Sequence, residues 1–305
     1  MNLLYLAIIS FVFISTSAIS LAKNTATVVY PDLKPPLGAV NYSDLPSLKK
    51  DHSKYPVLSA QSVMVVDLKS GVTLYEKDPQ RGLFPASTTK IVTAMVVLDN
   101  YDLNQEVTVP KFNVIGQKMG LIVGEKIKIG DLLNGLLIYS ANDAAEVLAL
   151  LHPNGREGFI DLMNQKVLDL GLVNTHFTNP AGLDSADQYS TVKDLITVSK
   201  VAMRNPIFAE IVGTKEKTVR SIDGFIKHKL VSTNKLLGTI EGVKGVKTGW
   251  TEVARENLVT DIERENKKIM VAVLGSQDRF GETKELIDWI FTNYEWKKVN
   301  LSQKL

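Results

Sequence analysis

The chain has 305 residues, of which 45% are hydrophobic and 22% charged, so it can bury a sizeable core and has the composition of a globular protein. Its formal net charge of +2 is spread along the chain with no dense block of lysine and arginine, which argues against nucleic acid as a partner. Because there are no cysteines, disulfides, thiol catalysis and thiolate metal sites are excluded.

The N-terminus carries an apolar run from Leu3 to Leu21 that is interrupted only by serine and threonine. This run predicts an export signal over residues 1–22, with Ser20 and Ala22 as the small residues before a cleavage site at Lys23. The same run is long enough to span a bilayer, so an uncleaved membrane anchor is the alternative. Either way the remaining chain is expected on the periplasmic or extracellular side.

Residues 23–57 are polar and contain four prolines between Pro31 and Pro46, which predicts an extended linker. Folded structure is expected to begin near Leu58. The β-branched runs 62–68 and 72–77 predict two strands joined by a turn at Gly71. Apolar residues at three- and four-residue steps then predict a helix over residues 87–100, with Pro85 just ahead of it.

The middle third of the chain is predicted to be mainly helical, with helices over residues 129–139, 143–151, 156–170 and 192–203. Short β-branched runs over residues 243–248, 257–262 and 268–274 predict strands, and a final helix is expected over 281–293. If the early and late strands join in one antiparallel sheet, the helical middle is an insertion and the fold class is α+β.

Ser87 and Lys90 are the first candidate pair for catalysis. A serine and a lysine three residues apart on a helix share one face, where the amine can take the hydroxyl proton. The Ser-x-x-Lys pattern occurs five times in the chain, but only at Ser87 does it open a long apolar helix. The N-terminus of a helix favours a developing negative charge, although a helix-capping serine beside a surface lysine would show the same pattern.

Two further motifs follow in the chain. Ser140 and Asn142 lie between two predicted helices, where an irregular backbone would let both side chains face a cleft. Lys247, Thr248 and Gly249 end a predicted strand, and the glycine there allows a ligand to approach the backbone closely.

Ser-x-x-Lys, Ser-x-Asn and Lys-Thr-Gly, in this order, form the signature set of penicillin-recognising serine enzymes. The chain resembles the low-molecular-weight penicillin-binding proteins of the D-alanyl-D-alanine carboxypeptidase type. The resemblance extends over roughly residues 59–298 and includes the segments 84–90, 135–149, 179–184, 234–237 and 246–251. It implies a β-lactamase/transpeptidase-like fold, with an antiparallel sheet flanked by helices and a mainly helical inserted subdomain. The domain would occupy residues 58–298, followed by a short tail over 299–305.

The resemblance also implies a role for each motif residue. Ser87 would be the nucleophile, and Lys90 would be its base once burial and a nearby cation such as Lys247 lower the lysine pKa. Ser140 would relay a proton, and Asn142 would hold the substrate backbone. Lys247, Thr248 and Gly249 would receive the terminal carboxylate, while the backbone N–H groups of Ser87 and Trp250 would form the oxyanion hole.

Arg279 resembles the family arginine that binds the substrate's C-terminus, although a charged residue in the first turn of a helix is the alternative. The chain departs from the family pattern at Arg255, a bulky cation expected beside the cleft. It also ends at Leu305, without room for the extra β domain and amphipathic anchor of many family members, so membrane attachment is expected only through an uncleaved N-terminus.

The expected partners are a peptidoglycan stem peptide ending in D-Ala-D-Ala, and β-lactams as acylating inhibitors; no cofactor or metal is expected. A D,D-endopeptidase, a β-lactamase and a catalytically silent wall-binding or β-lactam-sensing protein are the alternatives. A lactamase would need a deacylating glutamate between the second and third motifs, where Glu157 and Glu210 lie. The four histidines (His52, His152, His176 and His228) lack the short spacing of a zinc site.

Overall fold

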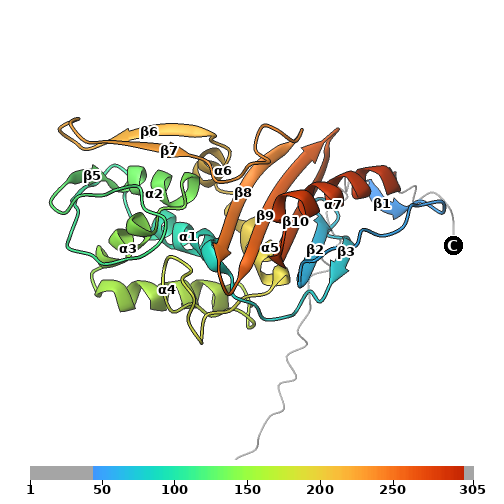
Figure 1. The fold of residues 1–305 in the computed structure, drawn as a ribbon, viewed down its shortest axis with the longest axis horizontal. Coiled ribbons are helices and arrows are strands. Elements are labelled where there is room, and N and C mark those ends of the chain that lie inside the picture. The colour runs from blue at the N-terminus through green and yellow to red at the C-terminus, as the bar shows by residue number, and fades with distance from the viewer. Residues whose placement is uncertain (1–43, 299–305) are drawn as a thin grey trace, which may run out of the picture. The chain divides into compact units, whose positions relative to one another are not determined.

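A five-stranded antiparallel sheet in the order β3-β2-β10-β9-β8 is the centre of the fold (Figure 1) in the computed structural model, which describes residues 44–298. Strands β2 (Ser62–Asp67) and β3 (Thr73–Lys77) precede the helices, whereas β8 (Val243–Thr251), β9 (Arg255–Arg264) and β10 (Lys267–Ser276) follow them. Because β10 pairs with both β2 and β9, the prediction that early and late strands form one antiparallel sheet is confirmed.

The sheet is apolar on both faces because its side chains alternate in direction. On β10, Ile269, Val271 and Val273 belong to one hydrophobic cluster, whereas the intervening Met270 and Ala272 belong to the other. The first cluster includes apolar residues of α7 (Arg279–Asn293), and the second includes those of α5 (Val192–Ala202). The two helices therefore cover opposite faces of the sheet (Figure 1).

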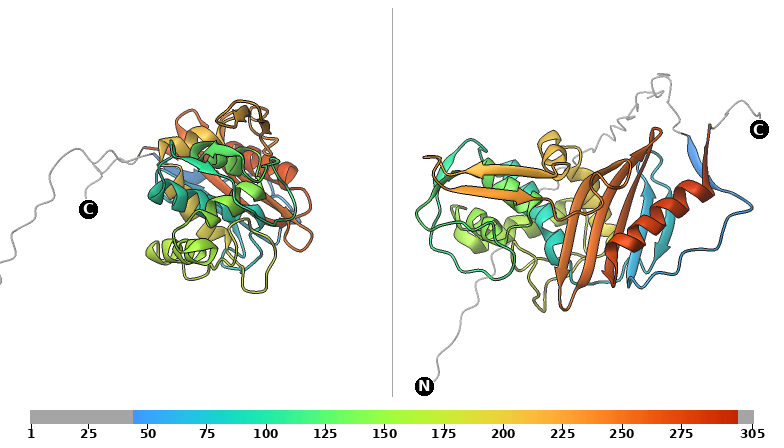
Figure 2. Two further views of the ribbon diagram at one scale, coloured as in Figure 1. Left: turned by 90° about the vertical axis from the view of Figure 1, so that its left-hand side faces the viewer. Right: turned by 45° about the horizontal axis from the view of Figure 1, so that its top comes forward.

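The chain between β3 and β8 is mainly helical, as predicted. Its elements are the 3₁₀ turn η1 (Ala86–Thr89) and the helices α1 (Lys90–Asn100), α2 (Ile129–Ile138), α3 (Asn142–Leu150), α4 (Gly155–Asp169), α5 and α6 (Pro206–Val212). It also contains two small hairpins that the sequence patterns did not predict, formed by β4 (Glu106–Thr108) with β5 (Lys126–Lys128) and by β6 (Glu216–Arg220) with β7 (Lys227–Val231). The right view of Figure 2 shows this insertion at the β8 edge of the sheet, with β2 and β3 at the other edge.

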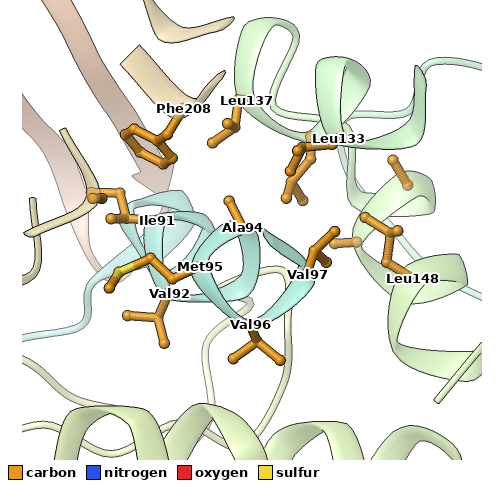
Figure 3. Packing of buried hydrophobic residues seen from close by; sticks show 14 of the residues in the cluster. Ile91, Val92, Ala94, Met95, Val96, Val97, Leu133, Leu137, Leu148 and Phe208 are labelled. Carbon is orange, nitrogen blue, oxygen red and sulfur yellow. The ribbon is translucent and has the colours of Figure 1, made fainter. Parts of the chain in front are cut away.

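Helix α1 forms the core of the insertion. Its residues Ile91 to Val97 are all buried, and Figure 3 shows Leu133 and Leu137 of α2, Leu148 of α3 and Phe208 of α6 packed around it. A helix that is apolar on all sides can exist only when other elements surround it. Since the η1 turn, which contains Ser87, leads directly into α1 at Lys90, this packing fixes the position of the first motif.

Residues 45–48, predicted as part of the extended linker, instead form strand β1 (Leu45–Leu48), so the expected start of folded structure near Leu58 is wrong. Strand β1 pairs with β11 (Tyr294–Lys297), and Pro46 is tolerated because the strand lies at an edge. The predicted signal peptide and C-terminal tail lie outside the described residues. Among residues 44–298, no helix is both long enough and apolar enough to cross a bilayer.

Substitution of Leu133 by alanine tests the packing around α1. Leu133 is fully buried against α1, so Leu133→Ala should lower the free energy of unfolding by about 2–5 kcal/mol. Leu168→Ala is the matched control, because Leu168 is 57% exposed on α4 and should change stability by less than about 0.5 kcal/mol. Urea denaturation of both variants measures the difference, and equal losses would contradict this account of the core.

Candidate active site

Ser87 and Lys90 face each other at the N-terminal end of α1. Ser87 lies in the η1 turn and Lys90 is the first residue of the helix, so they are one turn apart. The distance between Lys90 Nζ and Ser87 Oγ is 2.9 Å. Lys90 is completely buried whereas Ser87 is partly exposed, so the alternative of a surface lysine is wrong.

Two other oxygens accept hydrogen bonds from the Lys90 amine. Asn142 Oδ1 lies 2.7 Å from Nζ, and the carbonyl oxygen of Ala181 lies 2.6 Å from it. A neutral amine has two N–H bonds and one lone pair. With both N–H bonds donated to these acceptors, the lone pair is left for the hydroxyl proton of Ser87.

The neutral form of Lys90 is favoured by its surroundings. Burial, together with the nearby charge of Lys247, holds the pKa of Lys90 well below its usual value, while the carboxylate of Asp143 acts in the opposite direction. Removing an ammonium group from water penalises the charged state, and a second cation adds to that penalty. The lowered pKa makes Lys90 a base rather than a permanent cation.

Ser140 and Lys247 form a second serine–lysine pair in the same site. Ser140 lies between α2 and α3 with φ of +62°, a left-handed conformation that interrupts the helical backbone and turns its side chain inward. Lys247 Nζ donates to Ser140 Oγ at 2.8 Å. Burial and the charge of Arg279 lower the pKa of Lys247 to about 7, so its ammonium form is easily lost and regained near neutral pH.

Asn142 is the first residue of α3, and its side chain bonds both to Lys90 and to the loop that forms one wall of the site. Its side-chain amide nitrogen donates to the carbonyl of Ile115 at 2.7 Å, and its backbone N–H donates to the carbonyl of Gln117. The next residue, Asp143, accepts from three successive backbone N–H groups over residues 119–121. Asp143 was not among the predicted site residues; the sequence shows an acid directly after the Ser-x-Asn motif, but only the structure shows that it is buried.

Gly182 and Gly249 allow two segments to contact the η1 turn. A Cβ on Gly182, which has φ of +85°, would collide with the carbonyl of Ala86. A Cβ on Gly249 would come within 3.1 Å of the Ser87 backbone nitrogen. The Lys-Thr-Gly motif on β8 therefore lies directly against the nucleophile.

Ala181 was also not assigned a role from the sequence. Its backbone carbonyl accepts from Lys90, and a backbone acceptor has no residue type by which it can be recognised. The only signal was Gly182 beside it, a residue suited to a close approach between two segments.

The remaining predicted residues surround a cavity of about 570 Å³. Thr248 Oγ1 lies 2.6 Å from the hydroxyl of Thr233, Trp250 is 62% exposed at the rim, and Arg279 Nη1 donates to the carbonyl of Gly249 at 2.7 Å. Arg279 Nε is buried and has no hydrogen-bond partner among the described residues. Arg255 is not itself among the residues that line the cavity, but it begins β9 directly opposite Thr251, which does line it.

Comparison with known proteins identifies the family of this site. The sequence profile of the D-alanyl-D-alanine carboxypeptidase family matches residues 49–278. The chain belongs to this family of serine peptidases. D-alanyl-D-alanine carboxypeptidase DacF of Bacillus subtilis is 30% identical over 77% of the chain, and DacB2 of Mycobacterium tuberculosis is 34% identical over 76%.

The chain spans 63% of the length of the Bacillus relative and 82% of that of the Mycobacterium relative. Among solved structures, the Streptomyces K15 DD-transpeptidase superposes with a TM-score of 0.74 at 33% identity, covering 79% of this chain and 100% of the other. The α+β fold of the D,D-peptidases, predicted from the sequence, is thereby confirmed.

The two glutamates considered for a lactamase-type deacylation do not reach the site of this family member. Glu157 lies in the first turn of α4, where it contacts Arg156, and Glu210 lies in α6. Neither lines the cavity. His228 is buried, and its Nε2 lies 2.7 Å from Glu125 Oε1.

The titration of the two buried lysines tests the electrostatics of the site. In NMR spectra of the protein with labelled lysine side chains, Lys247 should titrate at about pH 7 and Lys90 well below its usual pKa. Lys247→Met removes a cation and should raise the pKa of Lys90, whereas Asp143→Asn removes an anion and should lower it further. Shifts in the same direction for both variants would contradict the assigned causes.

Proposed function

We propose that the chain is a serine-type D-Ala-D-Ala carboxypeptidase that removes the terminal D-alanine from peptidoglycan stem peptides through an acyl-enzyme on Ser87. The observation that carries this proposal is that Lys90 Nζ lies 2.9 Å from Ser87 Oγ while two other acceptors surround it, so a neutral Lys90 that donates to those two presents its lone pair to the Ser87 hydroxyl. Acyl transfer by serine requires such a base in contact with the nucleophile.

Acylation begins when Ser87 Oγ attacks the carbonyl of the penultimate D-alanine and its proton passes to Lys90 Nζ. The backbone N–H groups of Ser87 and Trp250 stabilise the oxyanion. As the peptide bond breaks, the leaving amine of D-alanine takes a proton through Ser140, which Lys247 can resupply across their 2.8 Å contact. Water then attacks the ester. The Ser140–Lys247 pair takes a proton from the water, and Lys90 returns its proton to Ser87 Oγ.

The terminal carboxylate of the substrate is bound by the Lys-Thr-Gly motif and Arg279, with Asn142 on the peptide backbone. A carboxylate beside Lys247 would favour the ammonium form, because an opposite charge raises a lysine pKa. The bound substrate would thus protonate Lys247 at the moment when a proton donor is needed. A cleft with two cations at its end is suited to peptides with a free C-terminus.

β-Lactams should acylate Ser87, and the resulting acyl-enzyme should be hydrolysed slowly, since no glutamate between the second and third motifs lines the cavity. This favours a peptidase over a lactamase. Asp184 also lines the cavity in that interval, where its Oδ1 accepts from Thr251 Oγ1 at 2.8 Å.

Intact mass after mixing with a penicillin tests the nucleophile. The wild-type chain should gain one persistent adduct that peptide mapping places on Ser87, and Ser87→Ala should gain none, with acylation reduced by at least about 10⁴-fold. Ser47→Ala is the matched control, because Ser47 begins another Ser-x-x-Lys pattern on the exposed strand β1. An adduct on Ser87→Ala would exclude Ser87 as the nucleophile.

Product analysis separates the alternatives. Release of D-alanine from a pentapeptide stem supports the carboxypeptidase, whereas cleavage of cross-linked dimers without D-alanine release would indicate an endopeptidase. Rapid penicillin hydrolysis with no adduct would indicate a lactamase. No adduct with intact penicillin would indicate a silent wall-binding protein.

We further propose that the chain is exported by its apolar N-terminal run and acts on the outer side of the cytoplasmic membrane, where its substrate lies. Protein recovered from the cells that make it should start at Lys23 when its N-terminal peptide is analysed by mass spectrometry. Recovery of a peptide that still contains residues 1–22, in the membrane fraction, would instead indicate an uncleaved anchor.

A further inference from the structure

Two shallow concavities, one beside the outer strand β3 and one beside α7, lie away from the catalytic cleft. The cleft lies along β8, and the outer strand at the other edge is β3. A concavity of about 500 Å³ beside β3 is lined by Tyr55, Tyr75 and Glu76, and a second of about 390 Å³ beside α7 is lined by Trp289 and Glu285 among others. We call these two concavities, with the rings between them, the Tyr55 groove.

Three aromatic rings form the floor between the concavities. The ring centroids of Tyr55 and Trp289 are 4.9 Å apart at an angle of 34°, and Tyr75 lies 6.3 Å from Tyr55 and 6.4 Å from Trp289. Trp289 is buried, whereas Tyr55 is 52% exposed. The cluster therefore presents the tyrosine ring to solvent on a packed aromatic support.

The exposed ring is held in place by hydrogen bonds on the N-terminal side of Tyr55. The backbone N–H of Ser53 donates to Asn293 Oδ1 at 2.7 Å, and Trp289 Nε1 donates to the carbonyl of Lys54 at 2.9 Å. Both partners lie on α7, so Tyr55 is attached to a helix that packs on the sheet. A fixed ring loses little conformational entropy when a ligand stacks on it.

The groove also carries hydrogen-bonding groups around the rings. The carboxylates of Glu76 and Glu285 line it, together with the hydroxyl groups of Ser53 and Thr292, whereas the Asp288 carboxylate already accepts from Lys284 Nζ at 2.8 Å. A protein partner with an apolar face would leave these acceptors without donors, which is costly. A sugar ring suits them, since it has an apolar C–H face for an aromatic ring and hydroxyl and amide donors at its rim.

We propose that the Tyr55 groove binds the saccharide chain of the wall polymer, so that the cleft acts on stem peptides of a strand held at the opposite edge of the sheet. This inference rests on the proposed function, which supplies a substrate attached to a glycan. Four strand spacings separate β3 from β8, roughly 20 Å, a distance that a polymer strand and its peptide branch can span.

Binding to glycan strands from which all peptides have been removed tests the groove without the cleft. The purified full chain, with Ser87 blocked by penicillin, should bind these strands in a sedimentation assay. Tyr55→Ala should weaken that binding about five- to tenfold, the loss expected for one aromatic contact, and Tyr55→Phe should retain most of it. Hydrolysis of a soluble pentapeptide should be the same for the wild-type chain and both variants.

Phe225→Ala is the matched control, because Phe225 is 87% exposed near the tip of the β6–β7 hairpin, at the opposite end of the view in Figure 1 from β3. It should leave glycan binding unchanged. No binding by the wild-type chain, or equal binding by Tyr55→Ala and Phe225→Ala, would overturn the groove assignment even if penicillin still acylates Ser87. Failure of the proposed function would instead appear as the absence of that adduct, whatever the glycan result.

Discussion

The buried amine of Lys90 is the constraint on which the catalytic site depends. An amine in a protein interior must have its N–H bonds accepted, and the acceptors here come from α3 and from the segment before Gly182. These two segments are distant in sequence from α1, so the base is in place only when all three are packed together. The same packing brings Gly249 of β8 against the nucleophile. Assembly of the site therefore requires the insertion to be folded and packed against β8.

The cationic groups of the site lie close together, so each makes the charged form of its neighbour less favourable. Burial lowers the pKa of both lysines, and Arg279 lowers that of Lys247 further, as Lys247 does for Lys90. A substrate carboxylate beside Lys247 and Arg279 would relieve the repulsion between these two cations. Binding energy gained at the carboxylate is then linked to the protonation of Lys247, while burial keeps the pKa of Lys90 well below its usual value.

Much of the fold could be predicted because its elements have strong local signals, whereas the candidate site was identified from the order of three motifs and the family they resemble, since Ser-x-x-Lys alone occurs five times. The helical period around Ile91 to Leu98 and the β-branched runs near Val271 identified elements that tertiary packing retains. The β6–β7 hairpin was missed because charged residues dominate both strands and each buries few side chains. Strand β1 was missed because proline suggested a linker. The carbonyl of Ala181 could not be predicted, since any residue could supply it.

Helix α7 connects the cleft to the opposite edge of the sheet. Arg279 in its first turn contacts Gly249 of the cleft, and Trp289, ten residues later, supports Tyr55. Ten residues of helix correspond to about 15 Å, and the helix is fixed along its length by the apolar cluster beneath it. A saccharide on Tyr55 would therefore lie at a set distance from the carboxylate end of the cleft. A flexible loop between the cleft and Tyr55 would allow this distance to vary, whereas a rigid helix keeps it constant.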